Sequence, residues 1–402
     1  MSSSTLNGIR PSILIIHHGQ GIGGGLIALI GLVEELKDNY KVHVLSIFDG
    51  IAVDYIRQTG VAVTVANEAF YTRYYQLLIH SDASYFNIID SFRSAKSLAL
   101  YFLSKYFFAK KELAKFSSSY DTIYLNSTFI TDWAYAAKQF DKKVIIHIRE
   151  PLSKGLFGFR RSIIRNTIDR YCDKIIAVSY DNSHRIALES KTTVVYDPVV
   201  IKNRIHSTGI MKSSKFRNFV YLGGMSRIKG FQQLVESLKY LDEDVRIYFL
   251  GGSSSYSDNG FKRFIRLFFD PFFLKNQQLI DVLNKANNII LVGLVDDVFK
   301  YYEDCIAVIC PFSKPHASLP ILEAFSFGRP VIVSDVKGMN ELVDCTNGVF
   351  FMNSNPESLA QKINAMSCVS ELSYEAMRVA CFLKYKSIRD ETESVTSVVS
   401  RM

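Results

Sequence analysis

Short apolar runs alternate with apolar-periodic segments along most of the chain. An apolar run at residues 13–16 is followed by a glycine-rich segment at 19–25, a periodic segment at 26–36 and a second apolar run at 41–47. Apolar runs bounded by turn residues are typical of buried strands, and apolar positions three and four apart are typical of amphipathic helices. This order predicts a doubly wound α/β domain at the start of the chain.

Similar runs continue on both sides of a polar, basic segment at residues 201–217, which has no clear period. The length of 402 residues favours two domains, and we place the boundary in this segment, with domains at 1–205 and 206–380. Further strands are predicted at 61–65, 121–126 and 143–148, then at 218–222, 245–250, 288–293, 306–310, 331–333 and 349–351.

The composition, 48% hydrophobic and 21% charged, is that of an ordered globular protein. Six scattered cysteines without a C-x-x-C pair argue against a zinc site and a disulfide scaffold, and suit a reducing cytosol. Residues 1–11 contain no apolar signal core, and no run approaches the roughly 20 apolar residues of a membrane span. We therefore expect a cytoplasmic protein, soluble or peripheral at a membrane.

The net charge of +8 suggests an anionic partner. Nucleic acid is disfavoured because no zinc finger, RNA-binding aromatic signature or helix-turn-helix pattern is present, which leaves an anionic membrane and nucleotide diphosphates. Three aromatic and basic stretches, at 68–116, 154–170 (with Arg160, Arg161 and Arg165) and 261–275, are candidates for membrane contact. Core aromatics with a solvated basic face explain the first stretch at least as well, and a surface helix packed by its apolar stripe explains the second equally well. Contact with a partner is the alternative for the third.

The most informative stretch is residues 310–343, C-P-F-S-K-P-H-A-S-L-P-I-L-E-A-F-S-F-G-R-P-V-I-V-S-D-V-K-G-M-N-E-L-V. A buried strand leads into a polar loop and a short helix that Pro320 begins, with Glu323 in its first turn, before a second strand. A carboxylate there can accept hydrogen bonds from ligand hydroxyls, and free N–H groups at a helix start favour an anion.

Two features of the first domain also point to a ligand. Gly19, Gly21 and Gly24 spell G-x-G-x-x-G, with Asp49 downstream as a ribose acceptor in a nicotinamide-dependent oxidoreductase. That motif is weak alone, because two histidines separate the strand from the glycines, and a merely tight turn remains an alternative. His147 ends a predicted strand, where open α/β sheets bind ligands; its neighbours Arg149 and Glu150 are also candidates to pair with each other.

Residues 310–343 resemble the nucleotide-sugar-binding segment of retaining GT-B glycosyltransferases of group 1 (GT4-type). Glu323 matches the second of the two glutamates of that family, followed by G-R-P-V-I-V-S-D, whereas Pro315 stands at the first. Residues 223–230 resemble the family pattern G-R-hydrophobic-x-x-x-K-G through Lys229 and Gly230, with Gly224 at the arginine position. The resemblance is strong over residues 219–351 and fair over 13–36 and 121–200.

The resemblance implies a GT-B fold, two Rossmann-like α/β domains facing across a cleft, with a strand at 173–179 closing the first and a C-terminal helix at 381–402 packing back on it. It implies transfer of a hexose-type sugar from a nucleotide diphosphate sugar with retained anomeric configuration. No metal or other cofactor is expected, and the leaving phosphate is expected to serve as the base. Catalytic roles fall to His147, Lys229 and Glu323. The implied donor-binding residues are Gly23, Gly24, Gly25, Gly224, Arg227, Lys229, His316, Ser318, Leu319, Pro320, Ile321 and Glu323.

The expected acceptor is a glycan, lipid-linked or otherwise held at the inner face of the cytoplasmic membrane, as in capsule, lipopolysaccharide or exopolysaccharide synthesis. Three alternatives remain open. The first is the nicotinamide-dependent oxidoreductase, and the second is a nucleotide-sugar epimerase. The third is a binding protein with a degenerate donor site, which Pro315 and Gly224 would explain.

Overall fold

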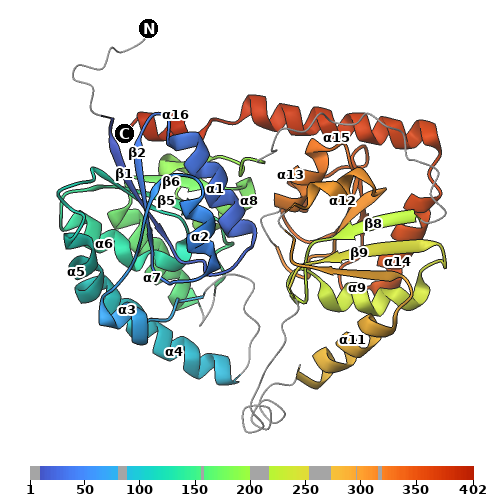
Figure 1. Ribbon diagram of the computed structural model, residues 1–402, viewed down its shortest axis with the longest axis horizontal. Helices are drawn as coiled ribbons and strands as arrows, with labels where there is room; N and C mark the ends of the chain where they lie inside the picture. Colours follow the sequence, from blue (N-terminus) through green and yellow to red (C-terminus); the bar gives the residue numbers. More distant parts are fainter. Residues whose placement is uncertain are drawn as a thin grey trace. The chain divides into compact units, whose positions relative to one another are not determined.

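The chain divides into two compact units in a computed structural model that describes residues 10–79, 88–154, 158–199, 217–252, 273–295, 297–315 and 319–402 (Figure 1). The first unit comprises Met1–Ser84, Asp90–Val200 and Thr392–Met402, and the second comprises Tyr85–Ile89 and Ile201–Glu391. The predicted stretch at 261–275 lies largely outside the described residues. Each unit is an α/β structure built on its own sheet.

The first unit contains a seven-stranded parallel sheet in the order β3-β2-β1-β4-β5-β6-β7. The order reverses between β1 and β4, so the carboxyl ends of these two strands flank the topological switch point, where open α/β sheets bind ligands. The strands are β1 (Ser12–His17), β2 (Lys41–Ser46), β3 (Ala62–Val65), β4 (Thr122–Leu125), β5 (Lys143–Ile148), β6 (Lys174–Ala177) and β7 (Thr192–Val194).

Helices cover both faces of this sheet, which explains the continuous apolar runs of its central strands. Ile13 and Ile15 pack under α1, α2 and α16, whereas Leu14 and Ile16 face the opposite layer, which contains α6 and α7. The helices are α1 (Gly24–Leu36), α2 (Ile51–Arg57), α3 (Ala69–Arg73), α4 (Ile88–Leu103), a π-helical turn (Ser104–Phe108), α5 (Ala109–Ala114), α6 (Asp132–Lys138), α7 (Phe159–Tyr171), α8 (Tyr180–Ile186) and α16 (Val395–Ser400).

The aromatic stretch at 68–116 supplies much of the core. Phe70 stacks on Phe108 with ring centroids 4.1 Å apart, and Tyr71 stacks on Trp133 at 4.9 Å. Tyr71, Tyr101 and Trp133 are at most 2% exposed. Core packing therefore accounts for these rings.

The second unit contains a six-stranded parallel sheet in the order β10-β9-β8-β11-β12-β13. Its switch point lies between β8 and β11. The strands are β8 (Arg217–Tyr221), β9 (Val245–Leu250), β10 (Ile289–Gly293), β11 (Ala307–Cys310), β12 (Val331–Ser334) and β13 (Gly348–Phe351), and the helices are α9 (Phe231–Ser237), α11 (Phe273–Lys285), α12 (Phe299–Glu303), α13 (Leu319–Ser326), α14 (Pro356–Ser367) and α15 (Glu371–Glu391).

The C-terminal segment divides between the two units. Helix α15 stays in the second unit to Glu391, because its buried face, which includes Cys381 and Ile388, continues past residue 381. The chain therefore returns to the first unit at Thr392 and not at residue 381, where the sequence analysis had placed the return. Helix α16 docks there through Val398, which is fully buried, and through Thr396, whose N–H donates to Glu35 at 2.9 Å.

Candidate functional site

The loops that follow β8 and β11 touch each other at the switch point of the second unit. The N–H of Ser313 donates to the carbonyl of Ile228 at 2.9 Å, and the Ser313 hydroxyl donates to the carbonyl of Arg227 at 2.9 Å. Gly230 has φ +85°, and a Cβ there would lie 1.6 Å from the Pro311 carbonyl oxygen. Only glycine permits this approach of the two backbones.

Gly224, which stands where the family pattern has arginine, has a backbone reason to be glycine. Its φ is +52°, and a Cβ would lie 3.0 Å from the Gly252 carbonyl oxygen. Its N–H donates to Leu250 at 3.0 Å, and its carbonyl accepts from the Tyr221 hydroxyl at 3.0 Å. Any larger side chain would be strained at this position, so the loop has no room for an arginine there.

Glu323 is the fifth residue of α13 and lies in its second turn; the prediction of the first turn was wrong. The helix begins at Leu319, so that Pro320 is its second residue, a position that needs no intrahelical N–H bond. The side chains of Leu319 and Ile321 are buried, which leaves only their backbone groups for a ligand. His316 and Ser318, two further predicted residues, lie outside the described residues.

Glu323 is 7% exposed, and its carboxylate accepts a hydrogen bond from the Tyr302 hydroxyl at 3.1 Å. Burial raises its pKa to about 7, against the opposing effects of Tyr302 and the positive charge of Lys229. Burial likewise lowers the pKa of the half-buried Lys229, and the charge of Glu323 opposes that shift. The loop after β8 and helix α13 thus bring one cation and one carboxylate into the same electrostatic environment.

In the first unit, Gly23, Gly24 and Gly25 are exposed at the start of α1. Among the described residues, no atom beyond the neighbouring backbone lies within 4 Å of a Cβ built on any of them, and none of the three has a positive φ. Helix α1 begins without a side-chain cap and without an acidic residue in its first turn. Neither packing nor a tight turn explains these three glycines, and the N–H groups at the helix start face no anionic side chain of the helix itself.

Asp49, which the nicotinamide alternative assigns to a ribose, is exposed and makes a local hydrogen bond. Its Oδ1 accepts from the N–H of Gly50 at 2.9 Å, and its carbonyl accepts from Gln20 at 3.2 Å. The side chain therefore helps to shape the turn that begins α2.

His147 is 1% exposed, and its Nδ1 lies 2.8 Å from the Tyr124 hydroxyl. Arg149 pairs with Asp197. Glu150 accepts from the Ser127 hydroxyl at 2.9 Å and from Thr128. The suggested pairing of Arg149 with Glu150 is therefore wrong.

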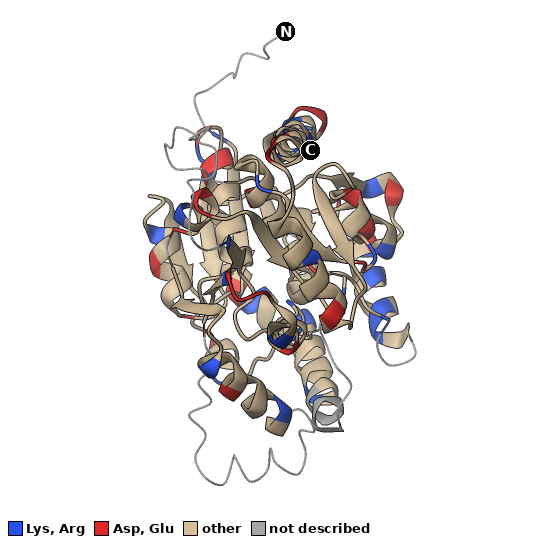
Figure 2. Cartoon of the chain, turned by 90° about the vertical axis from the view of Figure 1, so that its right-hand side faces the viewer, with Lys and Arg blue, Asp and Glu red and all other residues tan. Residues whose placement is uncertain are grey.

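The arginines of α7 bind backbone carbonyls. Arg160 donates to Ile79 at 2.7 Å, and Arg161 donates to Arg185. Arg165 donates to Ile186 at 3.1 Å and to Ala187 at 2.9 Å, the carbonyls at the C-terminal end of α8, where a cation is favoured. These hydrogen bonds within the fold account for the three arginines without a membrane contact. In Figure 2, Lys and Arg are interspersed with Asp and Glu over the chain.

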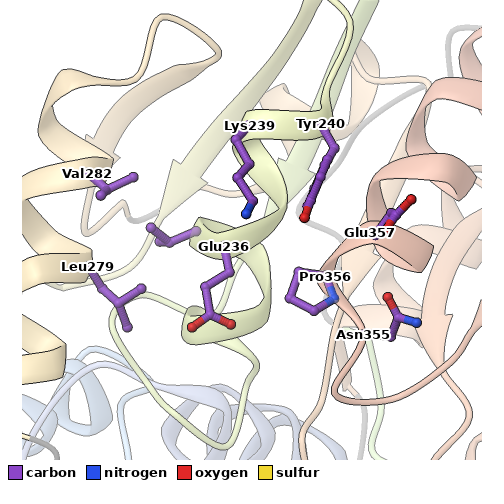
Figure 3. A pocket seen from close by; sticks show the side chains of 9 residues that line it. Glu236, Lys239, Tyr240, Leu279, Val282, Asn355, Pro356 and Glu357 are labelled. Carbon is purple, nitrogen blue, oxygen red and sulfur yellow. The ribbon is translucent and has the colours of Figure 1, made fainter.

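A pocket of about 460 Å³ lies elsewhere in the second unit, between α9, α11 and α14 (Figure 3). Glu236, Lys239 and Glu357 give it both signs of charge, and Glu236 pairs with Lys275 at 3.0 Å. Neither Lys229 nor Glu323 lines it. Within the described ranges no group of three or more His, Cys, Asp or Glu residues could hold a metal ion, and no helix is long and apolar enough to cross a bilayer.

The raised pKa of Glu323 predicts how the free energy of unfolding changes with pH. A carboxyl whose pKa is about 7 in the folded chain and 4.5 in the unfolded chain favours folding most below pH 4.5 and loses that contribution as the pH rises towards 7. The free energy of unfolding of the wild type, minus that of Glu323→Gln, should fall by roughly 3 kcal/mol over this interval. Urea unfolding followed by circular dichroism would measure it, with Glu357→Gln as control, and a difference that stays constant or rises with pH would contradict the assignment.

Comparisons with known proteins point to one family. Residues 217–367 match the family model described as "Glycosyl transferases group 1". An uncharacterised glycosyltransferase of Methanocaldococcus jannaschii is 26% identical over 218 residues, which are 48% of this chain and 48% of that protein. The chain spans about half the length of the curated relatives that it matches.

Solved structures are similar over nearly the whole chain. Anabaena HepE in complex with UDP-glucose has a TM-score of 0.69 at 16% identity, over 97% of this chain and 100% of that one. The lipopolysaccharide outer core galactosyltransferase WaaB has a TM-score of 0.57 at 16% identity, over 94% of this chain and 99% of that one. Together with the two parallel sheets, these likenesses confirm the predicted GT-B fold.

Proposed function

We propose that this chain, whose residues 217–367 match the group 1 glycosyltransferase model, transfers a hexose-type sugar from a nucleotide diphosphate sugar to an acceptor hydroxyl, with retention of configuration. The observation that carries the proposal is the buried carboxylate of Glu323 in the same environment as the ammonium of Lys229. A nucleotide sugar has a group for each charge, ribose hydroxyls for the carboxylate and a diphosphate for the ammonium.

Each charged residue then has a defined task. Tyr302 holds Oε2 of Glu323, and the carboxylate accepts hydrogen bonds from the ribose. Lys229 stabilises the negative charge that grows on the diphosphate as the bond from the sugar C1 to phosphate oxygen breaks. The acceptor oxygen forms its bond to C1 on the same face, and its proton passes to the departing phosphate. No metal ion takes part in this proposal.

The donor and acceptor classes rest on the neighbours. HepE was solved with UDP-glucose, and WaaB is a galactosyltransferase of the lipopolysaccharide outer core, which supports a hexose donor and an acceptor in surface polysaccharide synthesis. In the first unit the exposed N–H groups of Gly24 and Gly25 suit the phosphate or sugar oxygens of such a donor. The next experiment distinguishes a glycosyltransferase from the two alternatives, a nucleotide-sugar epimerase and a degenerate binding protein.

The experiment measures turnover with water as the acceptor. The protein is incubated with UDP-, GDP-, ADP- and dTDP-sugars, and NMR follows the nucleoside diphosphate and the anomer and configuration of the released sugar. One donor family should release sugar of the donor's own anomeric form. Lys229→Gln should lower kcat by about 10²- to 10³-fold, as does loss of one preorganised donor to a developing anion.

Lys239→Gln is the matched control, because Lys239 lies in the same unit and lines the separate pocket of Figure 3. It should leave kcat unchanged. Release of an epimerised sugar would identify an epimerase, and binding of a nucleotide sugar without turnover would identify a degenerate binding protein. Inversion of the anomeric configuration would contradict retention.

A membrane-held acceptor requires a surface that meets lipid, and we place that surface at the end of α4 and in the π-helical turn. Leu103, Tyr106 and Phe107 are 42%, 47% and 61% exposed, and the exposed Lys110 follows them one turn later. Apolar side chains flanked by lysine are suited to the interface of an anionic bilayer. This surface replaces the α7 arginines as the proposed membrane contact.

Phe107→Ser should therefore weaken binding to phosphatidylglycerol vesicles at low salt by about tenfold or more, since burial of a Phe side chain contributes about 1.5–3 kcal/mol. Vesicle co-sedimentation measures the effect. Tyr240→Ser, which removes a similarly exposed ring of the second unit, is the control. Equal binding by wild type and Phe107→Ser would refute this surface.

A further inference from the structure

Helix α15, the long red helix of Figure 1, carries a stripe of exposed apolar side chains. Leu372, Val379 and Leu383 are 84%, 53% and 62% exposed, and Ala376 between them is also exposed. Among the described residues, no other large apolar side chain is as exposed as Leu372. Successive members of the stripe are four, three and four residues apart, which is the spacing of a coiled-coil seam.

The opposite side of α15 packs on the second unit. The side chains buried there are Tyr374, Arg378, Cys381 and Ile388. The Tyr374 hydroxyl donates to the carbonyl of Ile306 at 2.8 Å, and the Cys381 thiol donates to the carbonyl of Asn347 at 3.4 Å. At about 100° per residue, these positions and the stripe lie on opposite sides of the helix. Packing within the second unit therefore leaves the stripe uncovered.

Apolar side chains exposed one at a time need no explanation, whereas a contiguous apolar surface marks a site of interaction. A surface helix normally carries polar residues on the side opposite the core, and α15 carries the stripe there instead. The stripe from Leu372 to Leu383 extends over about 16 Å of the helix axis. A second helix laid along it would cover all of its members.

One border of the stripe consists of small residues. Ser373, Ala380 and Ser387 recur every seven residues, so they form a row beside the stripe. The distance between the axes of two packed helices depends on the size of the side chains at the contact. Small side chains along this border therefore allow another helix to come close to the stripe.

The other border carries charges of opposite sign at its two ends. Glu371 is exposed at the N-terminal end of α15, and Lys386 is exposed towards the C-terminal end. In a parallel pair of two α15 helices, Lys386 of one copy would lie beside Lys386 of the other, and like charges repel. In an antiparallel pair, the acidic end of each copy would lie beside the basic end of the other. Charge complementarity therefore favours an antiparallel second copy.

The apolar residues fit the same arrangement. The antiparallel register that places Leu372 beside Leu383 of the second copy also places Ala376 beside Val379 of the second copy. In this register Glu371 lies within about one helical turn of Lys386 of the second copy. The apolar stripe and the charges at its border thus select one register.

We propose that α15 forms the interface of a homodimer, in which the stripes of two copies pack against each other in antiparallel orientation. The interface is two-fold symmetric, so every contact occurs twice. An interface of three helical turns is at the small end of the range for specific complexes, about 1,200 Å² or less. The dimer is therefore a weak one that forms at micromolar concentrations of the chain.

The first test is sedimentation equilibrium of the full chain at about 1 to 100 μM. The wild type should show a reversible equilibrium between monomer and dimer. Leu383→Asp should raise the dissociation constant by about 50-fold or more, because it removes a leucine from two contacts and puts a carboxylate in each. Leu274→Asp is the matched control, since Leu274 is 57% exposed on α11 of the same unit, and it should leave the constant unchanged.

Three outcomes would overturn the proposal. The first is a monomer at every concentration, and the second is a dimer that Leu383→Asp does not weaken. The third is a monomer whose binding to phosphatidylglycerol vesicles falls in Leu383→Asp, which would show that the stripe meets lipid rather than a second copy.

The second test exchanges the charges at the border. Glu371→Lys and Lys386→Glu should each raise the dissociation constant by about 3- to 10-fold, since each turns two symmetric attractions into repulsions. The double variant should return the constant to within about twofold of the wild type, because both pairs are restored with their signs exchanged. Lys362→Glu, at an exposed lysine of α14, controls for net charge and should change nothing. A double variant that stays as weak as the single variants would contradict the antiparallel arrangement.

Discussion

The backbone of Gly230 meets that of Pro311, and the arrangement of the loops after β8 and β11 in the second unit depends on this contact. Because Gly230 has φ +85° and no Cβ, the loop after β8 closes against the loop after β11, and Ser313 holds it there through two carbonyls. This closure places Lys229 close enough to Glu323 for each charge to oppose the shift that burial imposes on the other's pKa. Gly224 adds a second left-handed turn, and its backbone contacts explain why no arginine stands there.

The two units differ in the chemistry that they bury at their switch points. The second brings the buried carboxylate of Glu323 and the half-buried ammonium of Lys229 into one electrostatic environment. The first buries the imidazoles of His17, which Asn126 contacts, and of His147, which Arg149 contacts, and both Nε2 atoms are unpaired in the described part of the chain.

The pattern of apolar residues along the chain predicted most of the strands, because strands buried on both faces are continuous apolar runs. β5 (Lys143–Ile148) and β9 (Val245–Leu250) have the predicted bounds. β7 (Thr192–Val194) was missed because its three half-buried residues form no such run, and the short helices α2, α6 and α8 show too few turns for a period. The contacts of Tyr302, Ser313 and Arg149 join distant segments, which local spacing does not encode, although His17 at a strand end was a signal within reach. The resemblance supplied Lys229 and Glu323, and their roles stay predictions.

The central claim is that Glu323 and Lys229 form a site for a nucleotide diphosphate sugar. Its most direct test is a thermal-shift screen of the purified protein against UDP-, GDP-, ADP- and dTDP-sugars, repeated with Glu323→Ala. Stabilisation by one nucleotide family that is lost in the variant is the predicted result, since a ligand that binds only the folded chain raises its stability. No shift with any of the four families, or an equal shift in wild type and variant, would contradict the account.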